Sequence, residues 1–134
     1  MELRFKIWLA EDTDAGGEGY LGEGRFRLLY AIDRAGSLRK AAAQLGISYR
    51  KAWGDIRTAE AHLGFELVRR RRGGSSGGSS ALTEQARQLL QAFEEVKTNI
   101  QTVATQEFEK YIEPIFLNHK EHEAREEKKK LNMK

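Results

Sequence analysis

Three consecutive side chains, Tyr49, Arg50 and Lys51, carry the most specific chemistry in this sequence. They follow Gly46-Ile-Ser48, a glycine that suits a tight turn and a serine that can cap a helix. Arginine and lysine can bond to guanine O6 and N7 or to phosphate, and tyrosine can reach a phosphate or a thymine methyl. Such a helix start after a turn is typical of a helix that enters the major groove of DNA. The alternative is an ordinary solvated basic face.

A second basic cluster, Arg69 to Arg72, precedes a run of glycines and serines at 73–80. Four adjacent arginines beside a flexible tip could follow phosphates or enter a minor groove. They could instead form a solvated turn or a charged strand edge that discourages pairing. Between Arg34 and Arg72 there are ten basic and three acidic residues, although the whole chain has a net charge of only +3. This uneven charge predicts a face that binds polyanions.

The spacing of apolar residues predicts three helices that would position these cations, at residues 25–35, 38–45 and 49–63. Gly36 and Gly64 can end the first and third helices, and Ser37 can cap the second. Trp53 could be a stacking platform, but its place beside the apolar residues of the third helix favours the core.

Short strands are expected on either side of the glycine-serine run. Phe65 to Arg70 predicts one strand, and Ala81 with Leu82 predicts its return, so that together they would form a β-hairpin wing. The run itself would be the mobile tip, although its composition also resembles an engineered linker. Nearer the start, residues 3–10 alternate apolar and charged side chains, which predicts a half-buried strand.

A long last helix is predicted after Thr83 by apolar residues in alternating three- and four-residue steps. This seam consists of Ala86, Leu89, Phe93, Val96, Ile100 and Val103. It could pack on its own domain or pair with a second chain, and the length of the helix favours pairing. Pro114 is expected to end the helix. The charged residues 119–134 predict a frayed helix or a disordered tail.

Other site classes find little support. The chain has no cysteine, which excludes disulfides, thiolate metal sites and a cysteine nucleophile. His119 and His122 could share a metal, but a solvated tail is favoured because two histidines alone bind weakly. The pattern Gly17-x-Gly19-x-x-Gly22 matches a dinucleotide fingerprint, yet the acidic residues around it would repel a pyrophosphate. We therefore expect no enzyme activity, cofactor or metal.

The cellular location follows from segments that the sequence lacks. No apolar run approaches the ~20 residues needed to cross a bilayer. The first residues alternate charged and apolar side chains and do not form a signal peptide. Together with a mean hydropathy of -0.65, this predicts a cytoplasmic protein associated with the nucleoid and not with a membrane.

Several motifs resemble the winged-helix domain of the ModE molybdate-responsive transcriptional regulators and, more widely, the LysR-type regulators. They are Gly22-Glu-Gly-Arg25, Gly36-Ser-Leu38, Ile47-Ser-Tyr-x-x-Ala-Trp53 and Arg72-Gly-Gly followed by Leu82-Thr83. The resemblance covers roughly residues 3–105 and implies a DNA-binding winged helix-turn-helix that dimerises through its last helix. Full-length ModE proteins sense molybdate with further C-terminal domains, which would begin about where this chain stops. No molybdate ligands are therefore expected.

The expected fold is mainly α with a small β-hairpin wing. A winged helix-turn-helix would occupy residues 1–83, a long dimerisation helix 84–117 and a charged tail 118–134. The side chains expected at DNA are Ser37, Arg39, Lys40, Ser48, Tyr49, Arg50, Lys51, Arg57, Arg69, Arg70, Arg71 and Arg72.

The expected function is that of a sequence-specific regulator that binds double-stranded DNA as a homodimer. One alternative is an adaptor whose helix-turn-helix and long helix contact protein partners. The other is an architectural DNA-binding protein with little sequence preference.

Overall fold

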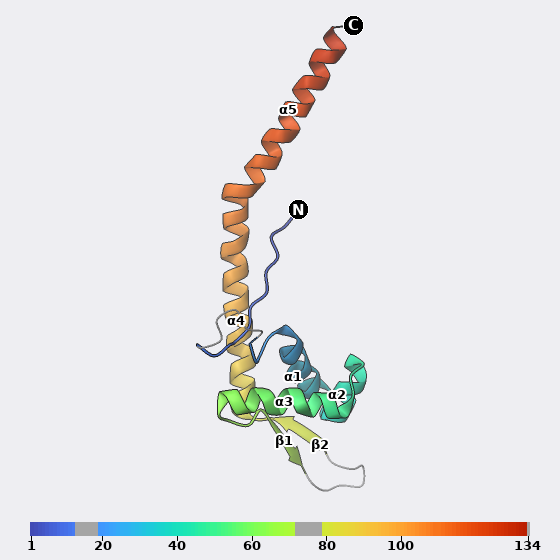
Figure 1. Cartoon of the computed structure of the whole chain (residues 1–134), viewed down its shortest axis with the longest axis vertical. Helices are drawn as coiled ribbons and strands as arrows, with labels where there is room; N and C mark the ends of the chain where they lie inside the picture. Colours follow the sequence, from blue (N-terminus) through green and yellow to red (C-terminus); the bar gives the residue numbers. More distant parts are fainter. Residues whose placement is uncertain (13–18, 72–78, 134) are drawn as a thin grey trace. The chain divides into compact units, whose positions relative to one another are not determined.

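The computed structural model describes residues 1–12, 19–71 and 79–133. The elements along the chain are α1 (Glu23–Ala35), α2 (Leu38–Leu45), α3 (Tyr49–Leu63), β1 (Val68–Arg71), β2 (Ser79–Leu82), α4 (Glu84–Glu107), the π-helical segment η1 (Phe108–Ile112) and α5 (Glu113–Asn132) (Figure 1). The predicted fold class is confirmed, because the chain is mainly helical and carries one small antiparallel hairpin. Its contacts divide it into two compact units, residues 6–95 and residues 1–5 with 96–134.

Local signals set the three helices of the first unit. The Ser37 side chain accepts a hydrogen bond from the Lys40 backbone N–H at 3.1 Å, and Ser48 accepts one from Lys51 N–H at 3.0 Å. Each serine thus satisfies a donor that the first helical turn leaves free. Gly46 has φ of 69°, a left-handed conformation that favours glycine and allows the sharp turn between α2 and α3. The predicted starts of α2 and α3 and the turn between them are confirmed, whereas α1 begins at Glu23, two residues before the predicted start.

The core of this unit lies where the three helices meet the first part of α4. Leu29 and Ile32 of α1 are fully buried, and Phe26 stacks on Phe93 of α4 with ring centroids 3.7 Å apart. Ala41 of α2 and Ala52 of α3 are buried as well, and small side chains let these helices approach closely. The result is a rigid support for the exposed side of α3.

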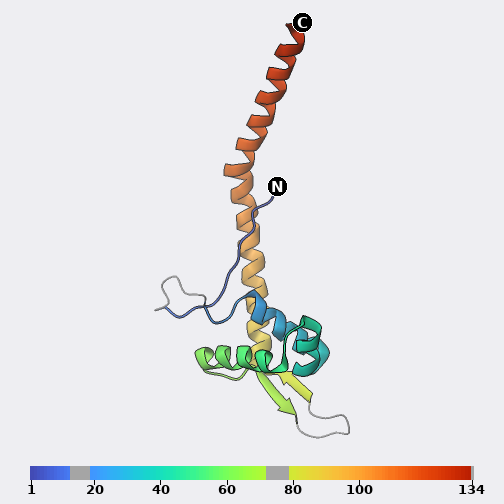
Figure 2. The ribbon, with the colours of Figure 1, turned by 45° about the vertical axis from the view of Figure 1, so that its right-hand side comes forward.

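The wing is a two-stranded antiparallel hairpin in which Val68 pairs with Leu82 and Arg71 with Ser79. In both ribbon views the hairpin lies on one side of α3 and α1 lies on the other (Figures 1 and 2). The predicted hairpin is confirmed, although its first strand begins three residues later than expected. Arg72 and most of the glycine-serine tip lie outside the described residues.

Polar side chains anchor the base of this hairpin. The Glu60 carboxylate on α3 accepts a hydrogen bond from the Leu67 backbone N–H at 2.7 Å. The Thr83 hydroxyl donates to the Glu66 carbonyl at 2.7 Å and accepts from the Ala86 N–H at 3.1 Å, so it caps α4 as well. The base of the wing is therefore fixed to both flanking helices.

The strand predicted at residues 3–10 is not formed. Leu9 makes a single isolated bridge to Leu21, and no regular strand includes either residue. The predicted alternation of burial is present, because Ile7 and Leu9 are half-buried while their neighbours Lys6 and Trp8 are exposed. A strand needs a partner of matching length, however, and among the described residues the chain lies opposite this segment at one point only.

The second unit corrects another prediction, because Pro114 does not end the helix. It lies in the first turn of α5, where a missing backbone N–H costs nothing. The preceding π-helical segment closes with the Glu113 N–H bonded to the Phe108 carbonyl, five residues back. This wider turn relieves the clash that a proline makes in a continuous α-helix. Helix α5 then extends to Asn132, through the residues for which a frayed helix or a disordered tail was predicted.

Candidate nucleic-acid interface

Two aromatic rings on α3 organise the candidate site. Tyr49 and Trp53, one helical turn apart, meet edge to face with their ring centroids 6.3 Å apart. The Arg39 guanidinium of α2 lies over the Tyr49 ring, 4.4 Å from its centroid. The Arg70 guanidinium of β1 lies 4.5 Å from the Trp53 centroid, and Arg57 lies 5.7 Å from the same centroid. We call these five residues the aromatic–arginine cluster.

A hydrogen bond also joins the wing to α3 within this cluster. Arg70 Nη2 donates to the Tyr49 hydroxyl oxygen at 3.2 Å. The two residues are 21 positions apart in sequence, so only the folded hairpin brings them together. Three elements, α2, α3 and β1, therefore present their cations at one place.

No described carboxylate offsets the positive charges of the three arginines in the cluster. Within the described parts of the chain, neither Arg39, Arg57 nor Arg70 forms a salt bridge with a carboxylate. The neighbouring Arg69 differs, because its Nε lies 3.2 Å from Glu66 Oε2. Aromatic faces attract a guanidinium without neutralising it. This side of the molecule is therefore strongly electropositive.

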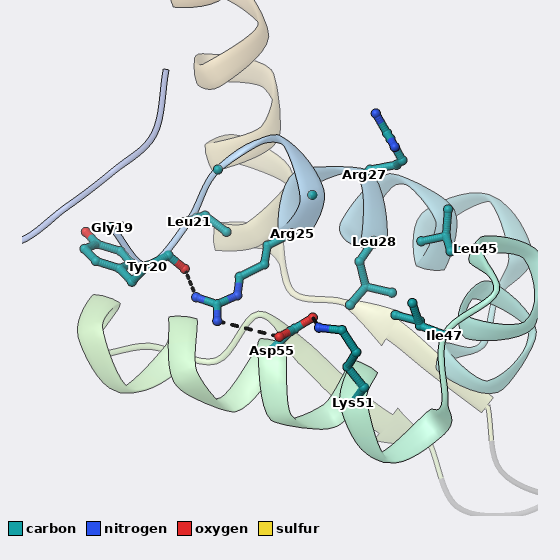
Figure 3. A pocket seen from close by; sticks show the side chains of 12 residues that line it. Gly19, Tyr20, Leu21, Arg25, Arg27, Leu28, Leu45, Ile47, Lys51 and Asp55 are labelled. Carbon is teal, nitrogen blue, oxygen red and sulfur yellow. Dashed lines mark hydrogen bonds and ion pairs between the residues drawn. The ribbon is translucent and has the colours of Figure 1, made fainter. Parts of the chain in front are cut away.

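Lys51, by contrast, is directed to another side of α3. Its Nζ lies 3.2 Å from Asp55 Oδ2, and Arg25 Nη2 of α1 lies 3.6 Å from Asp55 Oδ1 (Figure 3). Arg25 also donates a hydrogen bond to the Tyr20 carbonyl. These residues line an open pocket of about 460 Å³ between the start of α1 and α3. The carboxylate of Asp55 offsets both cations, so this pocket is less positive than the cluster.

The other predicted DNA contacts lie near the start of α2 and α3 or on the wing. Arg50 and Lys40 are exposed, and no described residue forms an ion pair or a side-chain hydrogen bond with either cation. The hydroxyls of Ser37 and Ser48 are already used as helix caps. The side chain of Arg71 and the whole of Arg72 lie outside what the structure describes.

Trp53 was expected in the core, and this prediction needs correction. The side chain is half-buried: it packs against the core, but one face of its ring carries Arg70. Its indole Nε1 is buried and has no hydrogen-bond partner among the described residues. The i, i+4, i+8 spacing of Tyr49, Trp53 and Arg57 could have indicated the shared face. Nothing local in the sequence could have predicted that Arg70 of the wing contacts the Trp53 ring.

The predicted dimerisation seam divides into two parts. Ala86 and Phe93 are buried in the core of the unit formed by residues 6–95, and Leu89 packs against that core. The remaining three residues are exposed: Val96 by 49%, Ile100 by 39% and Val103 by 55%. The first part of the seam is thus occupied within its own domain, and the second part leaves an apolar face on α4 uncovered.

No other kind of site is evident in the described residues. They contain no group of three histidine or carboxylate side chains that could hold a metal ion. His119 pairs with Glu123 one turn along α5, at 3.1 Å. None of the described helices is long and apolar enough to cross a membrane.

The chain resembles several known proteins. It is 34% identical over 99 residues to the molybdenum transport protein ModE of Azotobacter vinelandii, an alignment that covers 74% of this chain and 36% of the relative. The chain thus spans about a third of that relative. A solved complex of CbnR DBD with DNA is 19% identical, with a TM-score of 0.47 over 63% of this chain and 91% of that one. ArgP from Mycobacterium tuberculosis is 20% identical, with a TM-score of 0.45 over 63% of this chain and 30% of that one.

A family model gives the more specific result. Residues 24–87 match the bacterial regulatory helix-turn-helix proteins of the lysR family. The matched segment contains α1, α2, α3 and both strands of the wing, the elements that form the candidate site. Residues 24–87 are therefore similar to the DNA-binding helix-turn-helix domain of lysR-family regulators.

Proposed function

We propose that this chain is a sequence-specific DNA-binding transcriptional regulator that acts as a homodimer. The observation that carries the proposal is the convergence of Arg39, Arg57 and Arg70 on the rings of Tyr49 and Trp53 of α3 without a carboxylate partner among the described residues. Uncompensated cations on one face favour a polyanion. The LysR-type domain makes double-stranded DNA the fitting polyanion.

Base reading is assigned to the start of α3. Its first turn would enter the major groove, which is wide enough for an α-helix and presents a distinct pattern of groups for each base pair. Arg50 is the best candidate for a base contact, since it is exposed in that turn and forms no ion pair within the described residues. Lys40, at the start of α2, is placed to bind phosphate as in other helix-turn-helix proteins.

Dimerisation is assigned to the uncovered face of α4. Val96, Ile100 and Val103 follow the spacing of a coiled-coil seam and are exposed in the single chain. Pairing through this face would set two copies of α3 about one helical turn of DNA apart, about 34 Å, on a roughly palindromic site. In this arrangement the chain would act as a ModE-like DNA-binding domain.

A mobility-shift experiment with the full chain and a pool of random duplexes tests the proposal. At low salt we expect binding, and competition with unrelated DNA should leave a subset of sequences bound. Comparable affinity for every duplex would favour an architectural protein instead. No binding to any duplex would refute the proposal and favour the adaptor with protein partners.

A further inference from the structure

The aromatic–arginine cluster holds guanidinium groups in an unusual way. The guanidinium carbons of Arg39 and Arg70 lie over the rings of Tyr49 and Trp53, 4.4 Å and 4.5 Å from the respective centroids. A guanidinium that stacks on a ring keeps its N–H donors at its edge, where they can reach an acceptor. The rings therefore hold both guanidinium groups in place, and most of their N–H donors remain available, since the one hydrogen bond that they donate among the described residues is from Arg70 Nη2 to the Tyr49 hydroxyl.

The Tyr49 hydroxyl adds a further donor at the same place. Its oxygen accepts a hydrogen bond from Arg70 Nη2 at 3.2 Å, so its own O–H proton can be donated to another acceptor. The Arg70 guanidinium and this hydroxyl are thus neighbours that can both donate to one bound oxygen or oxygen pair. Arg39, over the same tyrosine ring, contributes a second cation beside them.

The positive charge of the cluster indicates that its ligand is an anion. Two guanidinium groups on one pair of rings repel each other, and no described carboxylate pairs with either Arg39 or Arg70. An anion bound between the two guanidinium groups would attract both of them and offset this repulsion. Arginine suits a phosphate in particular, because its planar fork matches two phosphate oxygens.

We propose that Arg39, Tyr49 and Arg70 form one preassembled clamp for a single backbone phosphate of duplex DNA, and that Trp53 is the positioning residue that holds Arg70 in it. The inference rests on the proposed DNA binding. It adds that the wing and α3 share one phosphate and bind it as a unit. The side chains need little reordering on binding, which reduces the entropy cost of the contact.

A matched pair of arginine variants on β1 provides the first test. Arg70→Gln and Arg69→Gln remove the same charge from adjacent residues, but only Arg70 contacts the cluster, while Arg69 pairs with Glu66. We expect Arg70→Gln to weaken duplex binding at least about tenfold. It should also lower the log-affinity against log-salt slope by about 0.9, and Arg69→Gln should change both less. Equal effects of the two variants would overturn the clamp.

A double-mutant cycle tests whether the clamp acts as a unit. Tyr49→Phe removes the hydroxyl and keeps the ring that supports Arg39. If Tyr49 and Arg70 bind the same phosphate, the loss in Tyr49→Phe/Arg70→Gln should be clearly smaller than the sum of the single losses. A duplex with one uncharged methylphosphonate at the contacted position should weaken binding of the wild type more than binding of Arg70→Gln, in which Arg39 and the Tyr49 hydroxyl still contact that phosphate. Additive losses, or no such position in a scan of the duplex, would refute a shared phosphate.

Variants of Trp53 test its role in positioning. Trp53→Phe keeps an aromatic face for Arg70 and should retain most of the affinity, whereas Trp53→Leu should lose about as much as Arg70→Gln. Equal affinity of the Leu and Phe variants would contradict the role. If Trp53→Leu does not fold, the cycle at Tyr49 and Arg70 still decides the clamp. A wild type that binds no duplex refutes the proposed function, whereas a wild type that binds with unaffected variants refutes the clamp alone.

Discussion

Arg50 lies at the start of α3 with neither an ion pair nor a ring contact among the described residues, unlike its neighbours. Tyr49 is engaged by Arg39 and Arg70, and Lys51 by Asp55. Of these three side chains, Arg50 alone has no ring contact or ion pair among the described residues, so it is the one best able to read a base. Cations that a ring contact or an ion pair already holds in place are better suited to binding the phosphates of the DNA backbone.

The Arg50→Ala variant tests this division of roles. It should cost about 1–3 kcal/mol at one base-pair position and relax sequence preference there. Affinities for a set of duplexes with single base-pair changes would measure the effect. Lys40→Ala serves as the comparison, since loss of a phosphate contact weakens all duplexes alike. A uniform weakening by Arg50→Ala would reassign Arg50 to the backbone.

Tyr30 of α1 provides a pH-dependent prediction. Burial, a hydrogen bond to Glu94 and the negative charge of Glu94 raise the pKa of Tyr30 from 10.0 to about 12. The unfolded chain therefore loses this proton at a lower pH than the folded one, so the stabilisation is fully present below pH 10 and is lost as the pH rises toward 12. The difference in unfolding free energy between the wild type and Tyr30→Phe should shift across this window. A constant difference would contradict the raised pKa.

Among the elements, the wing depends most on contacts that are distant in sequence. Thr83 caps α4 and binds the Glu66 carbonyl at the foot of β1, and Glu60 of α3 binds the Leu67 N–H. The hairpin has only two strands, which are marginal in isolation. These hydrogen bonds therefore help to hold the wing beside α3, where Arg70 meets Tyr49.

Removal of the buried Thr83 hydroxyl should destabilise the domain. We expect Thr83→Ala to lower the free energy of unfolding by about 1–2 kcal/mol, because it deletes a helix cap and leaves the Glu66 carbonyl without its partner. Thr83→Ser should recover much of the loss. Urea unfolding measures both, with the exposed Thr58→Ala as control, for which we expect a change within about 0.5 kcal/mol. Equal effects of the Ala and Ser variants at position 83 would show that the hydroxyl is unimportant.

The elements that could be predicted from sequence are those with local causes. Ser37, Ser48 and Gly46 act on their own helix ends, so the three helices and the turn were predictable. The strand at residues 3–10 failed because a strand depends on a partner elsewhere in the chain. The aromatic–arginine cluster was missed for the same reason: Arg70 reaches α3 only through the folded wing.

At the scale of the whole molecule, the proposed dimer depends on the uncovered face of α4. Val96, Ile100 and Val103 are exposed in the single chain, while Ala86 and Phe93 are used in the core. A seam of three exposed residues is short for a coiled coil. Any dimer would therefore be sensitive to a charge placed on this face.

The Ile100→Glu variant should accordingly weaken self-association. A buried carboxylate without a partner is costly, so the variant should sediment as a monomer at concentrations where the wild type is a dimer. Gln101→Glu introduces the same charge on an exposed neighbouring position and should leave the mass unchanged. A wild type that is monomeric at all concentrations would contradict the proposed dimer.

Selection of bound sequences from random duplex DNA, with the wild type and Arg50→Ala in parallel, tests most directly whether α3 reads DNA. We expect the wild type to enrich one roughly palindromic motif, with half-sites about one helical turn apart. The Arg50→Ala variant should lose preference at one position in each half-site. Binding without an enriched motif, or no binding to duplex DNA at low salt, would contradict the central claim.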